Sequence, residues 1–292
     1  MARKISKEHI DAYKNGIFKK LFEVIKEDPE LTFEIRMEDQ VMIYYHKDKI
    51  LTTKWHKRIK PEIIILDEKY YSKYNNKPSV CFDNEYELNR KEDIRSYFRE
   101  AKKLVYVYKM GAEFNIQQNI ALGNNSFNDK NRFLVVDMEW QLSQMSIPEN
   151  ERIKPTTRID LVIVDMEKDS EGYNDIYLAE LKLGLGATEG NSGTIDHVNK
   201  TWNIIKNEKA CASLFEDVES IIEQKEELGL IKGEHKDFHF GKRPKMMLIL
   251  AYRGEDEEKK LKAEFEKAKE EAHRLGMDEP KRIMHNALIK LE

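Results

Sequence analysis

The amino-acid sequence predicts a mixed α/β protein, of the α+β kind, with a central mixed sheet flanked by helices. Three strand-like segments follow one another closely, then comes a helical segment, and then a fourth strand-like segment. The four segments, each rich in aliphatic residues, are 133–142, 158–166, 175–183 and 245–253. Strands and helices in such an order are typical of a sheet that is covered by helices.

The helices of this expected core lie before the first strand and between the third and fourth strands. The first covers about residues 94–122 and the second about residues 194–209. The second helix has an apolar stripe at helical spacing, made of Ile195, Val198, Trp202 and Ile205. A polar turn at residues 168–174 joins the second and third strands, so these strands are expected to form an antiparallel hairpin.

The N-terminal part of the chain is expected to form a separate α+β module. Residues 5–26 have helical periodicity. The segments that alternate between apolar and polar residues after this helix are 31–37, 41–46 and 50–55. Polar turns separate them, which predicts a three-stranded meander. We therefore expect two domains, residues 1–85 and residues 86–292.

Three further segments complete the expected chain. Residues 70–93 are polar and rich in tyrosine, which indicates a connector. Residues 256–275 form a charged helix with a narrow apolar stripe, and residues 282–291 add an edge strand. Charge runs of this kind are usually solvated surface.

Two carboxylates and a lysine stand on the second and third strands of the expected core. Asp160 opens the second strand, while Glu180 and Lys182 lie two residues apart on the third. Because side chains alternate across a strand, Glu180 and Lys182 share a face. Carboxylate oxygens bind hard divalent cations, and such a metal polarises a phosphate and lowers the pKa of a bound water. With a lysine nearby to stabilise developing negative charge, the pattern indicates metal-dependent phosphodiester hydrolysis.

The acid on one strand, the Glu-x-Lys on the next and the order of the surrounding elements resemble the PD-(D/E)xK nuclease superfamily. The resemblance covers about residues 93–254 and implies a restriction-endonuclease-like core of helix, three strands, helix and strand. It also implies a nuclease, with DNA as the favoured substrate. Its cofactor would be Mg²⁺, with Mn²⁺ as a substitute, held by Asp160, Glu180 and the backbone carbonyl of Leu181.

The same resemblance implies a role for Lys182 in positioning or activating the attacking water. The products would carry a 5′-phosphate and a 3′-hydroxyl. Ile159 departs from the family pattern, which has a proline before the acid.

Other polar residues are candidates for extending the site. The family often takes a further metal ligand from the first core helix, where Glu113 is the candidate and Gln117 lies one turn beyond it. In the first strand, Glu139 and Gln141 share a face. Both sets have an ordinary alternative, because helix acids are usually solvated and an antiparallel sheet often has one polar face.

The segment after the third strand, residues 184–193, holds four glycines. It is either a mobile loop at the mouth of a cleft or a plain connector. On the polar side of the next helix, His197 and Lys200 are candidates for contact with the metal or with phosphate. A structural histidine and a solvated helix face are the ordinary alternatives.

The composition predicts a cytoplasmic protein with no membrane segment. No apolar run approaches the length that a bilayer requires, and the first residues lack an apolar signal region. Cys81 and Cys211 have no metal-ligand spacing and are too few for a disulfide framework, which fits a reducing compartment.

The net charge of −4 is awkward for a protein that binds nucleic acid, because such binding depends on lysine and arginine. The charge is uneven, however, since residues 1–60 contain 14 Lys and Arg against 10 Asp and Glu. Basic and aromatic residues gather at 54–60, either to contact nucleic acid or as a charged strand end. The expected partner is nucleic acid, and an enzyme with one site per chain that cuts both strands would pair as a homodimer.

Two alternatives to an active nuclease stay open. The chain could be a nuclease-like scaffold that no longer cuts and binds nucleic acid or another protein. The acids could also be ordinary surface charges on a real sheet. Metal binding separates these readings, because only the active site requires it.

Overall fold

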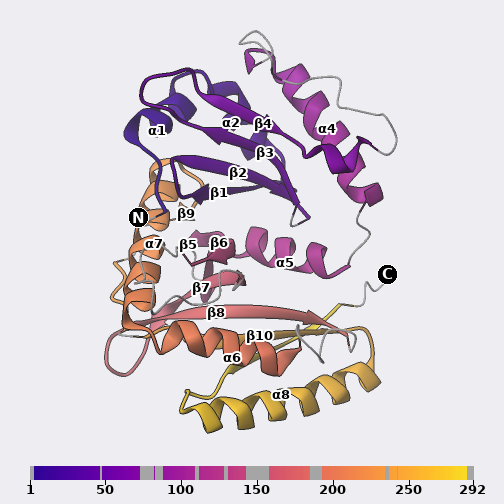
Figure 1. Cartoon of the computed structure of the whole chain (residues 1–292), viewed down its shortest axis with the longest axis vertical. Helices are drawn as coiled ribbons and strands as arrows, with labels where there is room; N and C mark the ends of the chain where they lie inside the picture. The colour runs from indigo at the N-terminus through magenta and orange to yellow at the C-terminus, as the bar shows by residue number, and fades with distance from the viewer. Residues whose placement is uncertain are drawn as a thin grey trace. The chain divides into compact units, whose positions relative to one another are not determined.

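The structure is a computed structural model that describes most of the chain. The described ranges are 3–46, 48–72, 82, 88–108, 112–127, 131–142, 158–184, 193–233, 237–241 and 243–287. The expected fold class is confirmed, because helices accompany one mixed sheet and one antiparallel sheet (Figure 1). Within the described ranges, none of the helices combines the length and the apolar character needed to cross a bilayer.

The chain divides into two compact units. The C-terminal unit comprises Ser126–Glu216 and Glu234–Glu292, and the N-terminal unit comprises Ala2–Asn125 and Asp217–Gly233. The boundary expected near residue 85 does not coincide with this division. Helix α4 (Lys91–Tyr108) contacts α2 and β3, so it groups with the N-terminal strands.

A five-stranded mixed sheet, in the order β11-β10-β8-β7-β6, forms the centre of the C-terminal unit. Its strands are β6 (Phe133–Gln141), β7 (Arg158–Lys168), β8 (Asn174–Leu183), β10 (Lys245–Tyr252) and β11 (Lys281–Asn286). β6, β7 and β8 are antiparallel neighbours, whereas β8, β10 and β11 run parallel. The four core strands and the edge strand expected from the sequence are all present, and β8 is central.

The turn that joins β7 and β8 into a hairpin is stabilised by an aspartate and a glycine in its sequence. The Asp169 carboxylate accepts hydrogen bonds from the backbone amides of Glu171 and Tyr173, each at 2.9 Å. Gly172 takes a φ of +88°, which a residue with a side chain rarely adopts. The expected antiparallel hairpin is therefore confirmed, and it sets the register of the two strands that carry the site.

Helices α6 (Thr194–Ile205) and α8 (Glu255–Leu275) cover one face of this sheet (Figure 1). They contact each other, and both contact β10. The apolar stripe of α8 is buried, as expected, and consists of Leu261, Phe265, Ala268 and Ala272. A further helix, α7 (Glu208–Glu227), begins just after α6 and contains the division between the two units. The short strand β5 (Ser126–Phe127) also belongs to the C-terminal unit.

The N-terminal unit contains a four-stranded antiparallel sheet in the order β1-β2-β3-β4. Its strands are β1 (Thr32–Arg36), β2 (Gln40–Tyr45), β3 (Asp48–Lys54) and β4 (Glu62–Ile65). Its other elements are α1 (Lys7–Lys14), α2 (Lys19–Glu27), the 3₁₀ helix η1 (Glu68–Tyr70), α4, α5 (Ala112–Gly123) and the short strand β9 (Lys232–Gly233). The expected meander is confirmed, and β4 extends it by a strand that was not expected.

Two expected helices are each divided in the structure. The helix expected over residues 5–26 is α1 followed by α2, because the chain turns at Asn15–Phe18. A Cβ atom on Gly16 would lie only 2.9 Å from the Cα of Ala12, so the close approach in this turn requires glycine. The helix expected over residues 94–122 is likewise α4 followed by α5, and Gly111 lies in the sequence between them.

Candidate active site

Strands β7 and β8 place the three expected site residues on one face of the C-terminal sheet. Val162 pairs with Leu178 across the two strands, and paired residues point to the same side of a sheet. Side chains two residues apart share that side, so Asp160 on β7 lies on the same face as Glu180 and Lys182 on β8. The sequence spacing alone established only that Glu180 and Lys182 share a face.

All three charged side chains are buried. The exposed fraction is 1% for Glu180, 5% for Lys182 and 9% for Asp160. On β10, the strand that neighbours β8 opposite β7, Leu248 pairs with Glu180 and Leu250 pairs with Lys182. Both leucines are also buried. Charges in such surroundings destabilise a fold unless other charges or a ligand compensate them.

His197, on α6, links the glutamate to the lysine. Its Nδ1 lies 3.0 Å from Glu180 Oε2, and its Nε2 lies 3.0 Å from Lys182 Nζ. Because the lysine ammonium can only donate, Nε2 is the acceptor and the ring proton is on Nδ1, the nitrogen nearer the carboxylate. Burial, together with the positive charge of Lys182, lowers the pKa of His197 to about 4, so the ring is neutral at pH 7.

Asp160 is held by the backbone of the neighbouring strand. Its Oδ2 accepts a hydrogen bond of 3.0 Å from the amide of Leu181, the residue between Glu180 and Lys182. The Asp160 charge also raises the pKa of His197, against the larger effects of burial and Lys182. The four side chains therefore lie within electrostatic reach of one another. Leu181 therefore contributes its backbone amide, which holds Asp160. The expected role of its carbonyl as a metal ligand stays a prediction.

A bulge in β6 decides which of its side chains face the site. Val135 pairs with Ile163, but Asp137 pairs with Val162, so Val136 is an extra residue between them. The extra residue shifts the alternation by one position, which moves the odd-numbered side chains after it to the other face. That face is the one that carries the site.

Glu139 lies on this face, opposite Asp160, between the recorded pairs on either side of it. It is buried and has a φ of +56°, a left-handed conformation that costs a non-glycine residue about 1 kcal/mol or more. Arg158, two residues before Asp160, places its Nη1 3.1 Å from Glu139 Oε2. Gln141, at the end of β6, is exposed. Of the two candidates on β6, Glu139 therefore lies beside the site and Gln141 lies in solvent.

The remaining accessory candidates come from α5, in the N-terminal unit, and from α6. Gln117 is buried in α5 of the N-terminal unit. Glu113 belongs to the same helix, and its side chain lies outside the described residues. Lys200 Nζ lies 2.5 Å from Asp196 Oδ2 on its own helix, although its charge contributes to the lowered pKa of His197. Most of the glycine-rich segment, residues 185–192, also lies outside the described ranges.

The donor set fits a hard divalent cation. Among Asp160, Glu180, Lys182 and His197, two side chains are negative, one is positive and one is neutral, so the group has an excess of buried negative charge. No three or more His, Cys, Asp or Glu side chains of the described chain are arranged to hold a metal ion. Mg²⁺ does not require such a cage, because it is usually bound through one or two carboxylates and keeps several waters.

The sequence named His197 as a candidate but not its position between Glu180 and Lys182, and Arg158 was not named. The bridging position of His197 depends on how α6 packs on β8, and no local pattern reveals it. Arg158 could have been found, because it lies two residues before Asp160 and therefore on the same face.

Comparisons of the chain with protein-family models, with curated proteins and with solved structures find no match.

Proposed function

We propose that the protein is a metal-dependent phosphodiesterase that hydrolyses nucleic acid, with DNA as the favoured substrate. One observation carries the proposal: Asp160, Glu180 and Lys182 are buried on one face of adjacent strands, and His197 lies 3.0 Å from both the glutamate and the lysine. The order of the strands around them is also the one that the resemblance to PD-(D/E)xK nucleases implies.

In this proposal, Asp160 and Glu180 hold Mg²⁺, or Mn²⁺ in its place. The bound metal would act as a Lewis acid on the phosphate and would lower the pKa of a water. Lys182 stabilises negative charge on the phosphate and orients the attacking water. His197 accepts a hydrogen bond from the Lys182 ammonium and so restricts where that charge can lie.

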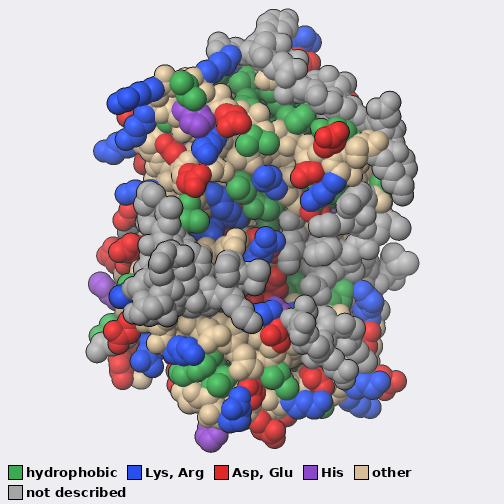
Figure 2. Space-filling view, in the orientation of Figure 1, with side chains coloured by type: hydrophobic (Ala, Val, Ile, Leu, Met, Phe, Trp, Pro, Cys, Tyr) green, Lys and Arg blue, Asp and Glu red, His purple; other side chains and the backbone are tan. Residues whose placement is uncertain are grey.

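The charge distribution is compatible with a nucleic-acid substrate. Basic and acidic side chains intermingle on the face seen in Figure 2, so the net charge of −4 is not concentrated there in one acidic field. Local groups of lysine and arginine can therefore neutralise phosphates even in an acidic protein. A cytoplasmic location and a homodimer that cuts both strands belong to the same proposal.

The alternative is a nuclease-like scaffold that binds nucleic acid or a protein without cutting. The observation in its favour is that Glu180 and Lys182 both contact His197, so the buried charges are already partly compensated without a metal. A scaffold of this kind would have no use for a dication. The two functions therefore differ in metal binding as well as in activity.

Calorimetric titration with Mg²⁺ and Mn²⁺ tests the metal site. We expect binding to the parent protein and its loss in Glu180→Ala. The matched control is Glu171→Ala, in the exposed turn of the same hairpin, which removes an equal charge and should bind the metal normally. Absence of binding to the parent protein would favour the scaffold.

Cleavage of supercoiled plasmid, with and without EDTA, tests the activity. We expect Lys182→Ala to retain metal binding and to lose cleavage, whereas Lys168→Ala, at an exposed position of β7, should cut normally. If Glu180→Ala and Lys182→Ala both cut the plasmid as fast as the parent protein does, the site assignment is wrong.

A further inference from the structure

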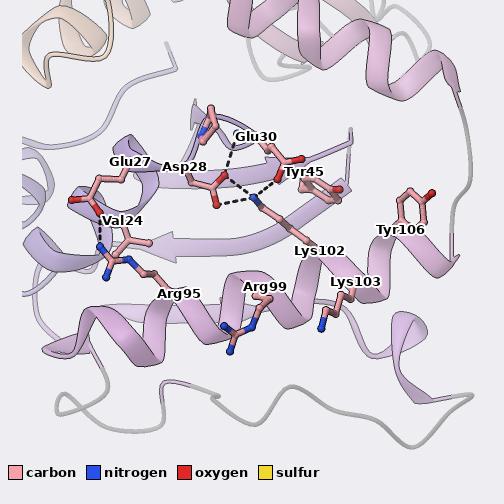
Figure 3. A pocket seen from close by; sticks show the side chains of 11 residues that line it. Val24, Glu27, Asp28, Glu30, Tyr45, Arg95, Arg99, Lys102, Lys103 and Tyr106 are labelled. Atoms are coloured by element: carbon pink, nitrogen blue, oxygen red, sulfur yellow. Dashed lines mark hydrogen bonds and ion pairs between the residues drawn. The ribbon is translucent and has the colours of Figure 1, made fainter. Parts of the chain in front are cut away.

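The N-terminal unit contains a groove whose residues lie far along the sequence from those of the candidate active site. It has a volume of about 570 Å³, which is within the usual range for ligand sites. Its walls come from the end of α2 with the segment that follows, from Tyr45 on β2, and from α4 (Figure 3). All of its lining residues belong to this one unit.

Helix α4 contributes four cations to the groove, at helical spacing. They are Arg95, Arg99, Lys102 and Lys103. Residues three and four apart on a helix share a face, so the four charges form one stripe. This stripe and the tyrosines beside it were not recognised from the sequence as a candidate binding site.

Two of these cations are neutralised by the opposite wall. Arg95 Nη2 lies 2.8 Å from Glu27 Oε2. Lys102 Nζ lies 2.6 Å from Asp28 and 2.8 Å from Glu30, and it also lies 5.4 Å from the centre of the Tyr45 ring. These contacts join α4 to the end of α2 and to the segment that follows it.

The other two cations are exposed and have no acidic partner within the described part of the chain. Arg99 donates to the neutral hydroxyl of Ser96 at 3.0 Å, and Lys103 extends away from the acids of the groove (Figure 3). Their charges are therefore available to an anionic ligand. The lining holds four cations against three acids, so the groove keeps a positive balance of charge.

Tyr106 adds an aromatic surface one turn beyond Lys103. Its side chain is 55% exposed, a large fraction for an aromatic residue, and it lines the groove. Arg99, Lys103 and Tyr106 are spaced at intervals of four and three residues, so they span about 10 Å along one face of α4. Cations that hold phosphates beside an aromatic ring that stacks on a base are the usual elements of single-strand binding.

We propose that this groove binds a single strand of nucleic acid, with Arg99 and Lys103 contacting phosphates and Tyr106 stacking on a base. The ligand class rests on the proposed nuclease function, and the groove would be a second contact region for the same substrate. Recognition would be tolerant of sequence, because phosphates and ring faces are common to all nucleotides.

The test is fluorescence anisotropy with a labelled oligothymidine strand in EDTA, so that no metal-dependent cleavage takes place. We expect the double variant Arg99→Glu/Lys103→Glu to bind at least about tenfold more weakly than the parent protein. The slope of log affinity against log salt should also become shallower by roughly 1.4, since each phosphate contact on a single strand contributes about 0.7. The control is Lys259→Glu/Lys260→Glu, at exposed positions of α8, which changes the net charge equally.

A second variant separates stacking from charge. Tyr106→Ala should weaken binding by about tenfold without changing the salt slope, because it removes a ring and no charge. Equal affinities of the two double variants would overturn the proposal. Displacement of the strand by free mononucleotide at an equal concentration of nucleotide would also overturn it, since the groove would then be a small-molecule site.

The outcome is independent of the proposed catalytic site. If the double variant loses affinity for the strand while the parent protein neither binds Mg²⁺ nor cuts plasmid, the groove proposal stands and the nuclease proposal fails. If cleavage depends on metal and Glu180 but strand binding is unaffected by Arg99→Glu/Lys103→Glu, the nuclease proposal stands and the groove proposal fails.

Discussion

Two histidines, one in each unit, have similar contacts and different surroundings. His9, on α1, places Nδ1 3.0 Å from Asp39 and Nε2 3.1 Å from the hydroxyl of Thr53. His197 places the same two nitrogens 3.0 Å from Glu180 and 3.0 Å from Lys182. In each case a carboxylate lies at Nδ1, and burial lowers the pKa of the ring.

The difference lies in the third group and in what surrounds it. The carboxylate, imidazole and hydroxyl around His9 have the order of a hydrolytic triad. However, Thr53 is fully buried, and its hydroxyl lies 2.5 Å from that of Tyr13. No substrate can reach such a hydroxyl, so the network is structural. At His197 the third group is an ammonium, and a second carboxylate, Asp160, lies nearby. A catalytic order of residues is therefore weak evidence, whereas an excess of buried charge calls for a ligand.

The largest contrast is expected between two aspartates that each accept a backbone amide. Asp160 binds the amide of Leu181, and Asp39 binds the amide of Ser6 at 2.9 Å. Asp160→Asn should lower the rate of plasmid cleavage by roughly 10³-fold, because a neutral amide is a poor ligand for the metal that activates water. Asp39→Asn should leave the rate per folded molecule unchanged. Equal rates for the two variants would remove Asp160 from the site.

The groups at Nε2 give the next contrast. Lys182→Met should slow cleavage by about 100-fold, because it removes the donor that stabilises developing charge. Thr53→Val should leave cleavage unchanged and lower the free energy of unfolding by about 1–2 kcal/mol, because His9 and Tyr13 lose a buried partner. Cleavage rates and urea unfolding measure the two effects. A slow Thr53→Val variant with normal stability would mean that the N-terminal network takes part in catalysis.

Replacing the histidines themselves should give smaller and opposite effects. His197→Gln should reduce cleavage by roughly tenfold, because partners of metal-site residues typically contribute at this level. His9→Gln should instead lower the free energy of unfolding by about 2 kcal/mol, because it breaks the contacts with Asp39 and Thr53 and the stacking on Tyr13 at 5.2 Å. The comparison fails if His197→Gln proves the less stable variant and His9→Gln the less active one.

The smallest expected effect is on the pH dependence of stability. Burial lowers the pKa of His9 below its ordinary value of 6.5, although Asp39 acts in the opposite direction. Below pH 6.5 the unfolded chain therefore binds a proton that the folded chain does not, and stability falls as the pH falls toward the lower, folded-state pKa. Between pH 7.5 and 5.5 the parent protein should therefore lose more stability than His9→Gln does in urea unfolding. Equal losses would show that His9 titrates normally in the fold.

The core strands were predictable because their signal is local. Segments such as Asp175–Leu183 carry apolar residues on both faces, which is typical of a central strand, and the acid and the Glu-x-Lys were visible within them. Helix α7 and strand β4 were missed although their signals are present. Ala210, Leu214, Val218 and Ile221 recur at helical spacing, and three isoleucines follow Pro61 and Glu62.

The remaining features depend on contacts between distant segments. No pattern around His197 tells that its two nitrogens meet Glu180 and Lys182, because that contact is set by the packing of α6 on the sheet. The extra residue Val136 is similarly hidden, since Val135–Asp137 reads as an ordinary strand. The face of the sheet on which Glu139 lies could therefore not be predicted from the alternation of residues, because the alternation is interrupted at the bulge.

Because of that bulge, the face on which the acids of β6 lie depends on the path of the backbone rather than on residue type alone. Removing Val136 would put Asp137 directly after Val135, so the pairs beyond the bulge would be kept and Glu139 would stay opposite Asp160. Straightening the strand with Val136 still in it would instead turn Glu139 toward the other side of the sheet, and so could silence this part of the protein without touching a single ionisable group.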